Sequence, residues 1–125
     1  MKTSELTGAL LDYWIAKAEG KNHLCFAYEI HGHMGSYSPS SNWEDGGPIL
    51  QHESISVEVI CYDNETDKNA INWEAKFEPP IRENDEVAPH WVVAEGRTAL
   101  VAAMRAYVAS KFGDEVEDLP IKGQS

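Results

Sequence analysis

The side chains best suited to catalysis or metal binding lie close together in positions 31–50, a stretch that contains histidines, serines and several glycines. The serines would be candidate nucleophiles if a histidine activated one of them, but no G-x-S-x-G frame surrounds them. Turn formation and helix capping explain them better. We therefore favour a non-enzymatic protein. The serines are Ser36, Ser38, Ser40 and Ser41.

A metal site is the second chemistry to consider. His31 and His33 are two residues apart, so at the end of a strand their side chains would point the same way. Together with Cys25, Cys61 or His52, the two histidines could supply the ligands of a zinc site. However, the chain has no C-x-x-C or H-E-x-x-H pattern, and two histidines do not complete a tetrahedral site. Surface histidines are the better interpretation, and we expect no metal or other cofactor.

The 37–50 segment is rich in turn-forming residues. The order Ser41-Asn42-Trp43-Glu44 fits a capping box, in which the Ser41 hydroxyl accepts a hydrogen bond from the Glu44 amide. This pattern predicts a short helical turn over residues 42–45.

The next residues predict an interruption and a restart. Gly46 and Gly47 are expected to end the first turn, because glycine adopts positive φ without steric cost. Pro48 suits the first position of a second helical turn over 49–53. The free amides at two helix starts could hold an anion, although Gly46-Gly47-Pro48 lacks the lysine and the following serine or threonine of a P-loop.

We expect this segment to be the binding surface, because loops held by a rigid scaffold often carry function. The alternative is that its caps are purely structural and that Trp43 covers the core. The segment residues predicted to bind are Tyr37, Ser38, Ser41, Trp43, Gly46, Gly47 and Pro48.

Length and charge limit the possible functions. The 125 residues predict a single domain over 1–125. The formal charge of −11 argues against direct binding to nucleic acids or anionic membranes, which are also negative. No apolar run suits a transmembrane span, and the opening residues do not resemble a signal peptide. Cys25 and Cys61 are expected to be free buried thiols, which favours a cytoplasmic location.

Two amphipathic segments predict the main helices. The first covers 6–19, with Ser4 as its N-cap, Gly20 as its stop and Trp14 at the centre of the buried face. The second covers 99–112. It starts after Thr98 and stops at Gly113. A seven-residue recurrence places three acids on one polar stripe of the first helix, namely Glu5, Asp12 and Glu19.

Alternating patterns predict strands at 23–30, 54–62 and 70–78, with a further short strand at 90–94. The last two long strands should form a hairpin. We therefore predict an α+β fold, in which an antiparallel sheet of three to four strands carries two main helices on its apolar face. An α/β/α sandwich, with the turns at 42–53 covering the other face, is the alternative.

The distribution of acidic residues leaves a second function open. The acidic tail at 114–120, the 83–86 cluster and the Glu5/Asp12/Glu19 stripe could together form one negative face. Such a face would mimic DNA and occupy a host DNA-binding protein.

Three segments carry a family resemblance. They are residues 1–20, the motif Tyr37-Ser38-Pro39-Ser40 with Trp43 and Gly46-Gly47-Pro48-Ile49, and residues 102–111 with 113–116. In this order they resemble NinX-like proteins of lambdoid phages and prophages, whereas residues 63–94 carry little of the resemblance. It implies a phage or prophage accessory protein in a bacterial cytoplasm, without indicating an activity.

The resemblance adds one expectation about the site. Because the two helices and the central segment carry it, they are expected to converge in space. Trp14, Tyr37, Trp43 and Tyr107 would then line one pocket, which extends the predicted site to Trp14 and Tyr107. The favoured function is a binding module for a small molecule or for a host or phage protein, and the DNA mimic is the alternative.

Overall fold

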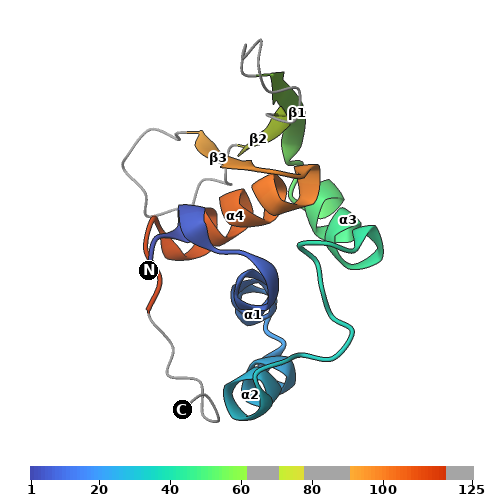
Figure 1. Ribbon diagram of the computed structural model, residues 1–125, viewed down its shortest axis with the longest axis vertical. Helices are drawn as coiled ribbons and strands as arrows, with labels where there is room; N and C mark the ends of the chain where they lie inside the picture. Colours follow the sequence, from blue (N-terminus) through green and yellow to red (C-terminus); the bar gives the residue numbers. More distant parts are fainter. Residues whose placement is uncertain (62–70, 78–90, 118–125) are drawn as a thin grey trace.

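The chain has an α+β fold, as predicted. The computed structural model describes residues 1–61, 71–77 and 91–117. A three-stranded antiparallel sheet lies at one side of the molecule, and the helices are arranged beneath one of its faces (Figure 1). The turn expected at 63–69, the acidic 83–86 cluster and the end of the tail lie outside the described residues.

The regular structure of the described residues consists of helices, one 3₁₀ turn and the strands of the sheet. None of the described helices is long and apolar enough to cross a membrane. In chain order, the elements are the 3₁₀ turn η1 (Thr3–Glu5), α1 (Gly8–Ala18), α2 (Asn22–His31), α3 (Trp43–His52), β1 (Ser56–Cys61), β2 (Ile71–Phe77), β3 (Val92–Gly96) and α4 (Ala99–Phe112).

The sheet has the order β1-β2-β3, and both pairings are antiparallel. The predicted hairpin is confirmed by the pairing of Val57 with Ala75 in β1 and β2. Ala75 also pairs with Ala94, so these three residues share the face that packs on the helices. The opposite face carries an in-register row of acids, Glu58, Glu74 and Glu95.

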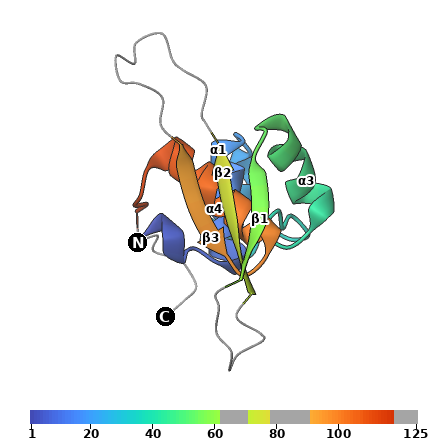
Figure 2. The same cartoon turned by 90° about the horizontal axis from the view of Figure 1, so that it is seen from above.

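Helix α4 was predicted with its observed bounds. The Thr98 side chain accepts a hydrogen bond from the Val101 amide, and Gly113 follows the last turn. Ala102, Ala103 and Ala106 are fully buried, which permits the close approach of α4 to the sheet. The helices lie on one side of the sheet (Figure 2), and no described helix covers the other face, so the sandwich alternative is wrong.

Helix α1 packs on the far side of α4 from the sheet (Figure 1). It begins at Gly8 after Thr7, because η1 occupies the residues around the predicted Ser4 cap. Leu11 and Ile15 are fully buried between the helices. The predicted position of this helix is thus confirmed, with a start two residues later and an end one residue earlier.

The strand predicted at 23–30 is wrong, because this segment forms α2. Cys25 and Tyr28 are buried at helical spacing and pack against α1, with the Tyr28 and Tyr13 ring centroids 5.2 Å apart. Phe26 is 62% exposed, although in a strand its side chain would lie on the same face as that of the buried Tyr28. A short apolar run fits either periodicity, and here contact with α1 selects the helix.

The two ends of the described chain are paired. The Met1 amino group donates to the Val116 carbonyl at 2.9 Å, and the Val116 amide donates to the Met1 carbonyl at 2.9 Å. The Thr3 hydroxyl donates to the Gly113 carbonyl at 2.7 Å. These bonds hold η1 against the end of α4 and help to bury Val116.

Candidate functional site

The segment at 42–53 forms one continuous helix rather than two turns. Asn42 is the N-cap of α3, and its side-chain oxygen accepts a hydrogen bond from the Glu44 amide at 3.0 Å. The predicted capping box between Ser41 and Glu44 is therefore wrong: the helix starts one residue later, with a side-chain cap from Asn42 alone. Gly46 and Gly47 do not interrupt the helix, and Pro48 lies inside it.

The reason for glycine at position 46 is close packing. A Cβ atom at Gly46 would overlap the Pro39 carbonyl and lie 2.9 Å from Leu100 Cδ2. The preceding loop and α4 thus both touch the backbone of α3 at this point. At Gly47, by contrast, the nearest atom to an added Cβ would be Trp43 Cε3 at 3.7 Å, an ordinary contact. Gly46 permits the contact that positions α3.

The loop before α3 is anchored on α1 by a buried acid. The Ser40 amide donates to Asp12 Oδ1 at 2.8 Å, and the Asp12 residue is only 4% exposed. The prediction that Asp12 belongs to a polar stripe is therefore wrong: this side of α1 is where the loop docks. A buried backbone amide needs a partner, and Asp12 provides it.

A second carboxylate holds the same loop from the other side. The Ser38 amide donates to Asp45 Oδ2 at 3.0 Å, which ties the loop to the first turn of α3. Burial raises the pKa of Asp12, the hydrogen bonds from Ser40 oppose this shift, and the negative charge of Asp45 adds to it. Pro39 and Ser40 are buried between the two acids.

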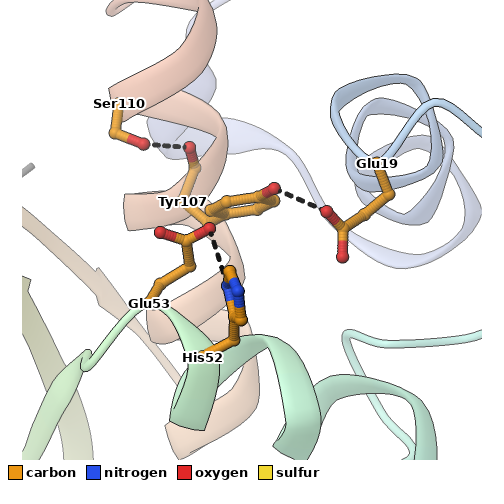
Figure 3. Close-up of polar contacts among 5 residues, drawn as sticks. All are labelled: Glu19, His52, Glu53, Tyr107 and Ser110. Atoms are coloured by element: carbon orange, nitrogen blue, oxygen red, sulfur yellow. Dashed lines mark hydrogen bonds and ion pairs between the residues drawn. The ribbon is translucent and has the colours of Figure 1, made fainter. Parts of the chain in front are cut away.

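Tyr107 is fixed between the helices. Its hydroxyl donates to Glu19 Oε2 at 2.8 Å, and the Ser110 hydroxyl donates to the Tyr107 carbonyl at 2.6 Å (Figure 3). Burial, the bond to Glu19 and the nearby charge of Glu53 raise the pKa of Tyr107 above its ordinary value. Glu19, a second member of the expected polar stripe, therefore joins α1 to α4.

The four aromatic residues expected in one pocket occupy different environments. Trp14 is 3% exposed and packs edge-on against Phe112, with ring centroids 5.2 Å apart. Tyr107 is also buried, and Tyr37 is half-buried with its hydroxyl enclosed. Trp43 is 57% exposed on the first turn of α3. Trp43 therefore faces solvent, while Trp14 and Tyr107 belong to the interior.

The arrangement offers little for nucleophilic catalysis. Ser40 is 4% exposed and packs against Asp12, and the Ser38 hydroxyl donates to the nearby Ser36 carbonyl at 3.4 Å. The His31 and His33 rings stack with centroids 5.9 Å apart at the end of α2. No group of three or more potential metal ligands occurs among the described residues.

Sequence reasoning missed the two aspartates that build this site. Asp12 lies in the run Leu11-Asp12-Tyr13-Trp14-Ile15, so an acid surrounded by buried apolar residues was the available signal. A charged group in such surroundings usually has a specific partner. The sequence around Asp45 gives no such signal, because Asp45 directly follows another acid, Glu44, in a polar segment.

A comparison with protein families identifies the chain's relatives. The family model described as Bacteriophage P22, NinX matches residues 2–111. The chain belongs to this family. None of the curated proteins matches this NinX-family chain. The matched range includes every described element except the final residue of α4, and membership indicates a phage accessory protein.

Proposed function

We propose that this NinX-family protein is a non-enzymatic binding module whose contact surface surrounds Trp43. The surface consists of exposed residues at the end of the loop and in the first six residues of α3, and is called the Trp43 surface below. Its members are Ser41, Asn42, Trp43, Glu44 and Pro48.

The observation that carries this proposal is the 57% exposure of Trp43. An exposed tryptophan presents a large apolar area to solvent, and tryptophan is enriched among the residues that dominate binding energy. The ring edge lies near the Gly47 backbone, where an added Cβ would be 3.7 Å from Trp43 Cε3. The side chain is thus placed for contact with another molecule.

The surroundings of Trp43 are held firmly, which reduces the entropic cost of binding. Asn42 caps the helix, and the bonds from Ser38 to Asp45 and from Ser40 to Asp12 fix the loop. In this proposal the predicted residues Tyr37, Gly46 and Gly47 support the surface from below. Trp14 and Tyr107 support it only through the core, because both are buried.

A protein segment fits this surface better than a small molecule. Small ligands are usually enclosed over most of their area, whereas Trp43 lies on the outside of a helix. The neighbouring Glu44 and the net charge of −11 favour a partner with basic groups around an apolar centre. We place this interaction in the cytoplasm of the bacterial host.

The proposal can be tested by capture from lysogenic bacteria. Tagged wild-type protein, Trp43→Ala and Phe26→Ala would be used as baits, and partners enriched by the wild type would be purified for affinity measurement. Phe26 is the matched control, because it is an equally exposed aromatic residue on α2. Trp43→Ala should weaken binding by about tenfold or more, whereas Phe26→Ala should not. Equal affinities for all three proteins would contradict the proposal.

An acidic decoy for a DNA-binding protein is the second candidate. The row Glu58, Glu74 and Glu95 across the outer sheet face favours it, because like charges directly opposite each other cost stability. Lys76 offsets part of this repulsion, with its Nζ 3.9 Å from both Glu58 and Glu74. A decoy should compete with DNA for its partner, and replacing the three glutamates by glutamine should abolish that competition. Unchanged competition would exclude this row as the mimic.

A further inference from the structure

A cavity of about 710 Å³ lies beside β3, at the opposite edge of the sheet from α3. Its volume is in the range of small-molecule sites. One wall consists of α4 and the N-terminal segment, represented by Arg105, Val101 and Thr7. The other contains the end of β3 and the neighbouring part of β2, including Gly96 and Asn72.

Two arginines line this cavity. The Arg105 Nε donates to the Leu6 carbonyl and its Nη1 to the Glu95 carbonyl, each at 2.8 Å. Both partners are neutral carbonyl groups. Within the described ranges, neither Arg105 nor Arg97 forms an ion pair with a carboxylate. Neither guanidinium is therefore engaged in a direct ion pair with a described carboxylate.

This absence of pairing is unexpected in a chain with 21 acidic and 10 basic residues. Arg105 is partly desolvated, and burial lowers its pKa, so its charge is costly to hold without a counter-ion. Its two backbone bonds fix the guanidinium in place. The charged group is therefore preorganised for an anion rather than free to find a carboxylate elsewhere.

The other groups at the cavity narrow the ligand class. Ser4, Thr7 and Asn72 add hydrogen-bonding side chains, while Val93, Ala94 and Val101 add apolar surface. Glu74 and Glu95 also line the cavity, and with the net charge of −11 they disfavour a polyanion. A single oxyanion group on a small organic body suits this combination, because guanidinium groups bind carboxylate and phosphate well.

We propose that the cavity between β3 and the start of α1 is a binding site for a small organic oxyanion, a carboxylate or a phosphate ester, held by Arg97 and Arg105. This site is separate from the Trp43 surface. Binding there would join β3, α4 and the N-terminal segment through one ligand.

The test is an NMR titration of the full chain with sodium phosphate and, separately, sodium succinate, at ionic strength held constant with sodium chloride. We expect saturable shifts of the Thr7, Gly96 and Val101 amides with at least one probe. The probe that saturates identifies the oxyanion. Non-saturating shifts with both probes would overturn the proposal.

Variants make the test specific to the cavity. Arg97→Gln should weaken binding on the order of tenfold, because it removes one charge-assisted contact. Arg97 is exposed and makes no hydrogen bond or ion pair with described residues, so the fold does not depend on it. Lys111→Gln removes the same charge at the other end of α4 and should leave the affinity unchanged. Equal affinities of Arg97→Gln and the wild type would refute the site.

Discussion

Asp12 accepts a hydrogen bond from the backbone amide of Ser40 at 2.8 Å, across 28 residues of sequence. This single bond joins the centre of α1 to the loop that leads into α3. Both residues are 4% exposed, so water cannot substitute for either partner. The position of the Trp43 surface therefore depends on an acid buried on a different helix.

Removing the Asp12 carboxylate should destabilise the protein. Asp12→Ala leaves the Ser40 amide buried without its acceptor, which should lower the free energy of unfolding by about 2–3 kcal/mol. Urea denaturation followed by circular dichroism would measure the change. Glu5→Ala is the control, because Glu5 occupies the same predicted stripe but is exposed, and it should change stability by less than about 0.5 kcal/mol. Similar losses for both variants would contradict the anchoring role.

The protonation of Asp12 should make stability depend on pH. Burial raises its folded-state pKa above the ordinary value of 3.8, so the folded protein binds the proton more tightly than the unfolded chain does. The stability contributed by the protonated group is complete below pH 3.8 and is lost as the pH rises through the folded pKa.

Asp12→Asn resembles the protonated acid and should not show this loss. Its free energy of unfolding should therefore improve relative to the wild type as the pH rises above 3.8, through the raised pKa of Asp12. Urea denaturation of both proteins at a series of pH values from below 3.8 upward would test the sign. A difference that stays constant, or that changes in favour of the wild type, would show that the carboxylate pKa is not raised.

The two adjacent glycines of α3 should respond differently to alanine. Gly46→Ala introduces a Cβ that overlaps the Pro39 carbonyl and crowds Leu100, which should cost about 2 kcal/mol or more. Gly47→Ala has room for its methyl group and should be neutral or stabilising by about 0.5–1 kcal/mol. Thermal unfolding of both variants would distinguish them. Equal effects would mean that α3 does not approach the loop as closely as described.

The bond between Tyr107 and Glu19 should couple α1 to α4. Tyr107→Phe removes a hydroxyl that donates to Glu19 at 2.8 Å, which should cost about 1 kcal/mol. In a double-mutant cycle with Glu19→Ala, the two changes should be non-additive by about 1 kcal/mol. Additive effects would show that this contact contributes nothing to stability.

Several elements could be predicted because local interactions determine them. The bounds of α4 were visible in the sequence, since Thr98 caps its first turn, Gly113 ends it, and its apolar residues recur at helical spacing. The alternation in β2 likewise predicted a strand with one buried face, and Ala75 lies on that face with no exposed area. Both patterns can be read within a single segment, and their neighbours in space reinforce them.

Tertiary contacts decided the remainder. Periodicity left α2 ambiguous, and only packing of Cys25 and Tyr28 against α1 selected a helix. The glycines in α3 suggested an interruption, but Gly46 serves the close contact with Pro39 and Leu100. Asp12 was expected on a solvent-facing stripe, but the loop at Ser40 packs over it and buries it. The sequence alone determined the capped helix and the alternating hairpin, because these depend on nearby residues. The arrangement of α1, the loop and α3 depends on partners far apart in the chain, so only the assembled structure determines it.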